Sequence, residues 1–174
     1  MKKNLFILSA IILLNSCVPI CPMVSFNKSS QTGKFIVSEV INVEGVSKKE
    51  LYKRSQIYLA KAFVNSKSVI AYSDKEEAYI IGKGSTIVNV GNDFGAYYYG
   101  EVSYSIELIS KDGKLQINLS DFIHSGNGKV PTYGRLERVA QRKSAACVLD
   151  YMNGYSRNLV ADLKKSITIT QEDF

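Results

Sequence analysis

Three cysteines and one histidine are the residues of this 174-residue chain whose chemistry is most versatile. Cys17 directly follows a short apolar run, and Cys21 lies four residues later. Cys147 and His124 are far along the chain. A cysteine can be a nucleophile, a metal ligand or half of a disulfide, and its surroundings decide which.

Cys17 ends a segment with the layout of a secretory signal peptide. Lys2 and Lys3 precede the apolar run 5–14, which is too short to span a bilayer. The motif "LNSC" that ends at Cys17 resembles a bacterial lipobox. This resemblance implies cleavage after residues 1–16 and lipidation of Cys17 on its sulfur and its new amino group. An ordinary signal peptide with an incidental cysteine is the alternative.

The other two cysteines leave two alternatives open. Cys147 falls on the apolar stripe of an expected helix, where a free cysteine behaves as a small apolar residue. An oxidising envelope would also permit a disulfide between Cys21 and Cys147. We take a buried, free Cys147 as the default.

No catalytic or metal-binding constellation is recognisable. His124 is the only histidine, which leaves no partner histidine for a zinc site, and we expect it to be a surface group of a loop. No serine lies in a G-x-S-x-G motif, and "GKGS" at 82–85 lacks the spacing of a phosphate-binding loop. We therefore expect no catalytic residues, no metal and no cofactor.

Two groups of residues are candidates for surface contacts. Tyr97 and Tyr99 belong to a glycine-flanked "YYY" and could stack on a sugar or a peptide. In an ordinary strand, Tyr98 would point the opposite way from both. A basic cluster could contact anionic lipid headgroups, or it could be a solvated helix face. Its members are Arg135, Arg138, Arg142 and Lys143.

The composition fits one domain behind a tether. The net charge of +6 falls to +4 when residues 1–16 are removed, which is too little to indicate nucleic-acid binding. We expect a lipidated N-terminus and flexible tether at 17–33 and a single domain at 34–168. Residues 169–174 form a C-terminal tail.

The domain alternates strands and helices. Val102, Tyr104, Ile106 and Leu108 alternate with polar residues, as do the apolar residues of 114–120 after an Asp-Gly turn. This pattern indicates an antiparallel hairpin with one apolar face. Ser47 and Glu50 form a capping box before an amphipathic helix. Further strands are expected at 34–43, 68–74 and 77–84, and a long helix at about 136–167. The fold class is α+β, an antiparallel sheet in β-α-β-β-β-β-α order with two helices on one face.

The segments "VEGVSKKELYKRSQIYLAKAF", "VIAYSDKEEAYIIGKG" and "GEVSYSIELISKDGKLQINLSDFIHSG" resemble the family called domain of unknown function 4468. The resemblance covers roughly residues 35–166, except 85–100 and 124–134. It implies a TATA-binding-protein-like fold in an exported bacterial protein. The family brings no catalytic residues to carry over.

These features predict a non-enzymatic lipoprotein of the bacterial cell envelope, anchored in the outer membrane and facing the periplasm. Its domain would bind another envelope component, either a protein or a glycan. A structural subunit or scaffold of an envelope assembly is the alternative, and a hydrolase with scattered carboxylates comes third. Nucleic acid is not an expected partner, because the open sheet face would carry Glu101 and Glu107.

Overall fold

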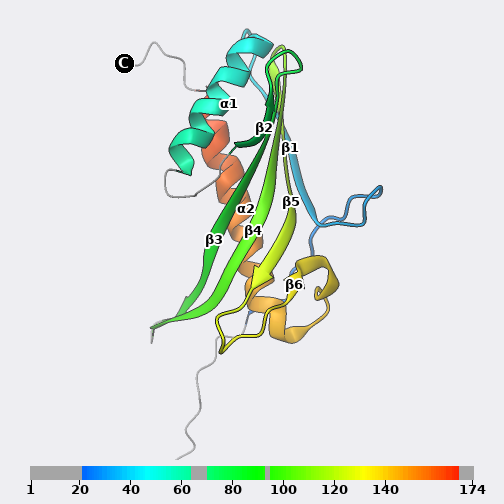
Figure 1. Cartoon of the computed structure of the whole chain (residues 1–174), viewed down its shortest axis with the longest axis vertical. Helices are drawn as coiled ribbons and strands as arrows, with labels where there is room; N and C mark the ends of the chain where they lie inside the picture. Colours follow the sequence, from blue (N-terminus) through cyan, green and yellow to red (C-terminus); the bar gives the residue numbers. More distant parts are fainter. Residues whose placement is uncertain (1–20, 64–69, 93–94, 169–174) are drawn as a thin grey trace, which may run out of the picture.

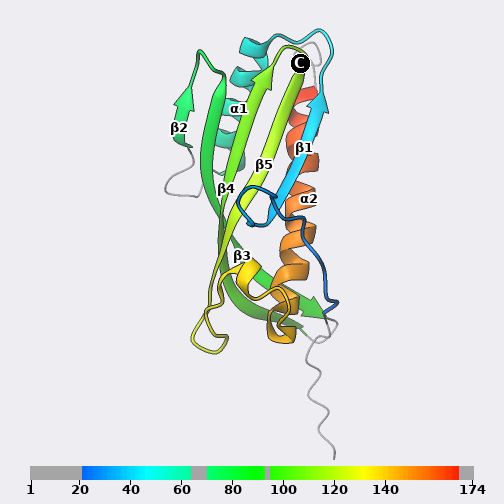
Figure 2. The ribbon, with the colours of Figure 1, turned by 90° about the vertical axis from the view of Figure 1, so that its right-hand side faces the viewer.

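A computed structural model describes residues 21–63, 70–92 and 95–168. The expected signal peptide, Cys17 and the tail 169–174 lie outside the described residues. The chain forms an antiparallel sheet in the order β1-β5-β4-β3-β2, and β6 pairs with β5. Two long helices cover one face of this sheet, and the other face is open (Figures 1 and 2). This arrangement is the α+β architecture expected from the sequence.

The elements follow one another with short connections. The strands are β1 (Ile36–Asn42), β2 (Ile70–Asp74), β3 (Tyr79–Asn92), β4 (Gly95–Lys111), β5 (Lys114–Ser125) and β6 (Gly134–Arg135). The helices are α1 (Lys48–Ala62), the 3-10 turns η1 (Leu136–Arg138) and η2 (Lys143–Ala145), and α2 (Ala146–Thr168). Within the described residues, none of these helices is long and apolar enough to cross a membrane.

The alternating hairpin forms the centre of the sheet. Ile106 pairs with Leu119 and Leu108 with Ile117, and all four side chains are fully buried against the helices. Burial of each such side chain stabilises the fold by about 1.5–3 kcal/mol. The alternation in sequence therefore predicts the buried face correctly, since a strand has a side-chain period of two.

Helix α1 begins where the capping box places it. The backbone N–H of Glu50 donates to Ser47 Oγ (3.3 Å), which satisfies one of the unpaired donors of the first turn. Leu51 and Leu59 are fully buried beneath the helix.

Two elements differ from the expectation. A strand was expected to end at residue 84, but one 14-residue strand, β3, runs from Tyr79 to Asn92. The last helix begins at Ala146 instead of about residue 136, because η1 and η2 occupy the preceding segment. Val139 is buried although it does not lie on α2. An apolar residue at helical spacing therefore did not indicate a continuous helix in this segment.

Candidate functional site

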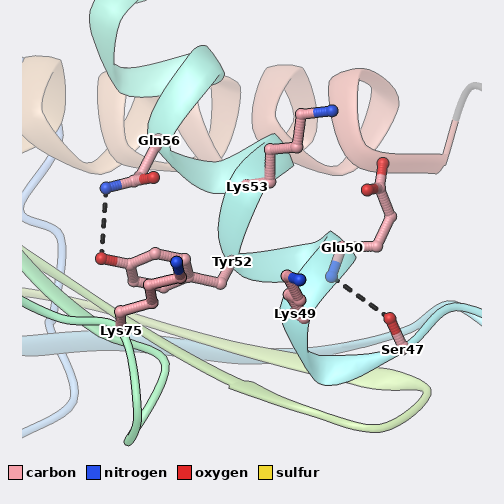
Figure 3. Close-up of a pocket in the computed structure, with 7 residues that line it drawn as sticks. All are labelled: Ser47, Lys49, Glu50, Tyr52, Lys53, Gln56 and Lys75. Carbon is pink, nitrogen blue, oxygen red and sulfur yellow. Dashed lines mark hydrogen bonds between the residues drawn. The ribbon is translucent and has the colours of Figure 1, made fainter.

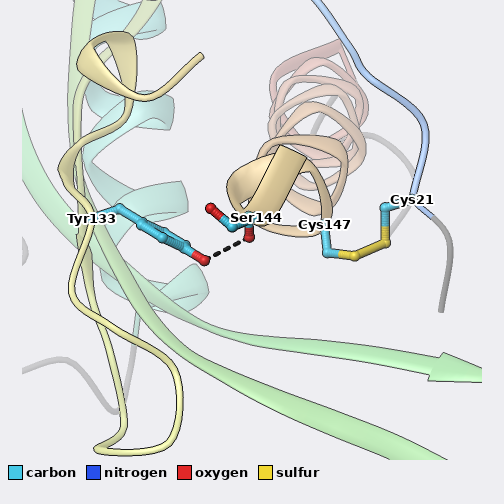
Figure 4. Close-up of a disulfide and its surroundings, with 4 residues drawn as sticks. All are labelled: Cys21, Tyr133, Ser144 and Cys147. Carbon is cyan, nitrogen blue, oxygen red and sulfur yellow. Dashed lines mark hydrogen bonds between the residues drawn. A yellow bond between two sulfur atoms is a disulfide. The ribbon is translucent and has the colours of Figure 1, made fainter. Parts of the chain in front are cut away.

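One end of the molecule is closed by a disulfide between Cys21 and Cys147 (Figure 4). Their Cα atoms are 4.9 Å apart, and 126 positions separate them in the sequence. Cys147 is the second residue of α2, so the bridge holds the N-terminal segment against the start of that helix. Of the two alternatives for Cys147, the structure has the bridged one. Cys147 is buried, as expected, but the default of a free thiol was wrong.

The N-terminal segment is also held by packing. The ring of Phe26 stacks on that of Phe35 (4.9 Å between centroids) and lies 5.8 Å from that of Phe122. Lys28 forms a β-bridge with Phe35. Residues 21–28 are therefore held against the domain, in contrast to the flexible tether expected for 17–33. Prolines and polar residues are typical of a flexible tether, but the single aromatic anchor, Phe26, fixes this segment.

The three tyrosines lie at the same end, around an irregularity of β4. Val88 pairs with Gly100 and Asn89 with Tyr98, so Tyr99 is an extra residue of the β-bulge type. Tyr97 and Tyr98 are 45% and 48% exposed, whereas Tyr99 is half-buried against the core. The exposed pair is thus Tyr97 and Tyr98, not Tyr97 and Tyr99. Tyr97 and Tyr98 pair in regular register with Val90 and Asn89, so their side chains leave opposite faces of the strand.

His124 is a buried structural residue of β5, not the surface group of a loop that was expected. Its Nε2 lies 2.8 Å from the carbonyl oxygen of Tyr99, and its Nδ1 accepts a hydrogen bond from the backbone N–H of Tyr133 (3.3 Å). The two contacts together require a neutral ring that donates through Nε2. Burial lowers the pKa of His124, although the hydrogen bond to Tyr99 acts in the opposite direction.

A chain of contacts joins the tyrosines to the disulfide. The Tyr133 ring stacks on His124 (4.9 Å between centroids), and its hydroxyl donates to the carbonyl oxygen of Ser144 (2.6 Å). Ser144 lies three residues before Cys147 in the sequence. Figure 4 draws the hydrogen bond of Tyr133 together with the disulfide. Asn127, in the loop between β5 and β6, donates to the carbonyl oxygen of Tyr98 (2.6 Å). We call this region the disulfide end. It comprises Cys21, Tyr97–Tyr99, residues 126–133 and residues 136–147.

The basic cluster is divided by the structure. Arg135 lies 3.1 Å from Asp121 and 3.8 Å from Glu137, so its charge is compensated. Hydrogen bonds from Lys34 and Arg135 hold the pKa of Asp121 below its usual value.

The rest of the basic cluster is exposed. Arg138, Arg142 and Lys143 lie on η1, η2 and their connection. A helix face was one expectation for these residues. They lie instead on turns at the disulfide end.

A second candidate site is a pocket beside the first turns of α1 (Figure 3). It is lined by Ser47, Lys49, Glu50, Tyr52, Lys53, Gln56 and Lys75. Glu50 also pairs with Arg54 (2.9 Å), so the three lysines make the pocket electropositive. Such a pocket suits a carboxylate or phosphate group. Lys75 comes from the turn after β2, and no sequence signal placed it beside α1.

The pocket and the disulfide end lie at opposite ends of the long axis. Arg54 of α1 donates to the carbonyl oxygen of Ile167, near the end of α2. Cys147 is twenty residues earlier on the same helix, about 30 Å away at 1.5 Å per residue. Figure 1 shows the same arrangement, with the start of α1 at the top and the start of α2 below.

The open face of the sheet carries a chain of hydrogen bonds across four strands. Ser38 donates to Asn118 Oδ1 (2.6 Å), and Asn118 Nδ2 donates to Glu107 Oε2 (2.6 Å). The Tyr79 hydroxyl donates to the other oxygen of Glu107. Burial, with Glu107 beside it, raises the pKa of Tyr79 to about 12, so it remains a donor. The polar groups of this face therefore satisfy one another.

Among the residues with described positions, no three histidine, cysteine, aspartate or glutamate side chains gather as metal ligands. The Glu107 carboxylate is held by Tyr79 and Asn118, and His124 is held by two backbone groups. These arrangements fix structure and leave neither group aimed at a cavity. The described sites present lysine side chains and exposed tyrosines to solvent.

An antiparallel sheet with two helices on one face defines a TBP-like α+β domain. Residues 38–125 match the family described as "Domain of unknown function (DUF4468) with TBP-like fold", and the chain belongs to this family. A search of curated proteins finds no significant match.

Two solved structures share the fold. One is a DUF4468 family protein from Bacteroides ovatus ATCC 8483, 16% identical, with a TM-score of 0.69 over 88% of this chain and 93% of that one. The other is a TBP-like protein from Parabacteroides distasonis ATCC 8503, 19% identical, with a TM-score of 0.61 over 88% of this chain and all of that one. At these identities the likeness defines the fold.

Proposed function

We propose that this protein is an exported lipoprotein whose DUF4468 domain is a non-enzymatic binding module of the cell envelope. The observation that carries the proposal is the position of the disulfide. Cys21 lies four residues after Cys17, the expected lipid attachment point, and is bonded to Cys147 of the domain. A structural disulfide suits an oxidising envelope and not a reducing cytoplasm.

The proposed partner is another envelope component, a protein or a glycan, and the proposed location is the outer membrane, facing the periplasm. A binding role is supported by the electropositive pocket at Lys49, Lys53 and Lys75, whose cations suit an acidic group. A scaffold subunit of an envelope assembly is the second candidate, supported by the open face of the sheet, which the two helices leave uncovered.

Metabolic labelling with radioactive palmitate tests the anchor. We expect the wild type to incorporate label and Cys17→Ser to incorporate none, because the thiol of Cys17 is the acceptor. Cys21→Ser is the matched control, since it removes a nearby thiol and the disulfide but leaves the lipobox intact. Equal labelling of wild type and Cys17→Ser would refute the lipoprotein assignment.

Crosslinking in intact cells separates the two binding roles. A stoichiometric crosslinked partner would favour the scaffold, whereas a monomer would favour a module that binds a soluble ligand. Replacing all three pocket lysines by glutamine should then abolish capture of an acidic ligand without lowering the melting temperature. Unchanged capture would exclude the pocket as the contact.

A further inference from the structure

The length of chain before the disulfide determines which end of the domain is near the membrane. This step rests on the proposed function, in which Cys17 carries the lipid. Cys21 lies four positions after Cys17, a stretch that spans at most about 14 Å when fully extended. Because Cys21 is bonded to Cys147, the attachment point cannot move far from the start of α2.

The charge at this end suits an anionic surface. Residues 126–147 contain five basic residues, namely Lys129, Arg135, Arg138, Arg142 and Lys143, and one acidic residue, Glu137. Glu137 lies 3.8 Å from Arg135, and Asp121 also pairs with Arg135. The remaining four cations are exposed. Basic side chains beside a lipid anchor are attracted to anionic headgroups.

Exposed tyrosines accompany these cations. Tyr97 and Tyr98 lie near the tip of β4, and almost half of each side chain is exposed. The loop 126–133 lies next to them, because the side chain of Asn127 donates a hydrogen bond to the carbonyl oxygen of Tyr98. Tyrosine is favoured at membrane interfaces, because its ring is apolar and its hydroxyl is polar. Tyr97 and Tyr98 are regular neighbours on β4, so one exposed ring lies on each face of the strand tip.

We propose that the disulfide end is a membrane-docking face that rests on the anionic phospholipid headgroups of the leaflet holding the anchor. Arg138, Arg142 and Lys143 contact the phosphates, and Tyr97 and Tyr98 lie at the headgroup level. The disulfide keeps this face toward the membrane. Docking therefore orients the domain relative to the membrane. The lysine pocket of α1 is held about 30 Å farther from the membrane surface, toward an envelope partner.

The first experiment measures headgroup binding without the anchor. The mature chain with Cys17→Ser, which cannot be lipidated, is sedimented with vesicles of phosphatidylglycerol and phosphatidylcholine and with pure phosphatidylcholine vesicles. We expect binding to the anionic vesicles only, weakened by salt. Replacing Arg138, Arg142 and Lys143 by glutamine should weaken it about fivefold per cation, on the order of a hundredfold in total.

A matched control has the same loss of charge at the other end. Replacing Lys49, Lys53 and Lys75 by glutamine should change vesicle binding by less than about threefold, because that pocket faces away from the membrane. Equal losses for the two triple variants would show attraction by net charge and would overturn the docking face. Absence of binding to anionic vesicles would overturn it as well.

The second experiment reports orientation in the lipidated protein. The chain contains no tryptophan, so Tyr98→Trp gives a single reporter at the disulfide end. Brominated lipids should quench this tryptophan strongly, and should spare a tryptophan at Tyr72, an exposed position on β2 near the pocket. Equal quenching of the two reporters would overturn the proposal.

The two proposals fail separately. Absence of palmitate label from the wild type would refute the lipid anchor. Vesicle binding by the unlipidated chain would still test the docking face on its own. Normal labelling with no vesicle binding would keep the lipoprotein and remove the docking face.

Discussion

His124 shows how one buried side chain can organise the end of a sheet. It bridges the bulge at Tyr99 and the backbone of Tyr133, which belong to segments far apart in the sequence. A single histidine with no motif around it carries no sequence signal for this role. What decides the role is burial, which only the packed structure determines.

The histidine predicts a pH dependence of stability. Unfolded His124 has a pKa near 6.5, and burial lowers the pKa in the folded protein. Below about pH 6.5 the unfolded chain therefore binds a proton that the folded chain does not, and the free energy of unfolding falls. The stability is fully present above pH 6.5 and is lost as the pH falls toward the lowered pKa.

Urea unfolding between pH 7.5 and 5 checks this effect. One group can contribute a slope of at most about 1.4 kcal/mol per pH unit. His124→Gln should be less stable at pH 7.5, and its slope should be smaller than that of the wild type. Identical slopes in the two proteins would show that other groups cause the dependence.

At the scale of elements, the bulge in β4 depends on Gly100. Its φ is +116°, and a Cβ there would lie 2.1 Å from the carbonyl oxygen of Ser125. Glycine is the residue that tolerates both conditions. The bulge contains Tyr99, which packs half-buried against the core.

Gly100→Ala should therefore lower the free energy of unfolding by about 3 kcal/mol or more, from backbone strain and overpacking together. Gly128→Ala is the matched control, because its φ is +86° but no heavy atom lies within 4 Å of the added Cβ. We expect this control to cost only about 1–2 kcal/mol. Similar losses for the two variants, measured by urea unfolding, would contradict the close contact at Gly100.

The start of α2 shows where periodicity is insufficient. A helix was expected from about residue 136, yet α2 begins only at Ala146. In residues 136–145, the buried side chains Leu136 and Val139 are positioned by 3-10 turns. A capping box predicts the start of a helix more accurately than apolar periodicity does, because its first residue is the N-cap. The S-x-x-E box at Ser47 predicted the start of α1 correctly.

At the scale of the whole molecule, the disulfide joins the first described residue to the last helix. A bridge across 126 positions removes much of the freedom of the unfolded chain. Cys21→Ala should therefore lower the free energy of unfolding by about 2–5 kcal/mol relative to the oxidised protein.

Denaturant unfolding with and without a reducing agent measures this difference. The reducing agent should destabilise the wild type to about the level of Cys21→Ala, and should leave the variant unchanged. A wild type insensitive to reduction, with its thiols shown to be free, would contradict the structural role of the bridge.

The sequence by itself determined the α+β class, the apolar face of the central hairpin and the start of α1, because each depends on local periodicity or capping. It also contained the lipobox-like motif at Cys17, which is readable without a fold. Tertiary structure alone decided that Cys21 meets Cys147, that His124 is buried and that Tyr98 is exposed beside Tyr97. It also brought Lys75 to the lysines of α1. These features depend on contacts between residues distant in the chain, which local patterns do not encode.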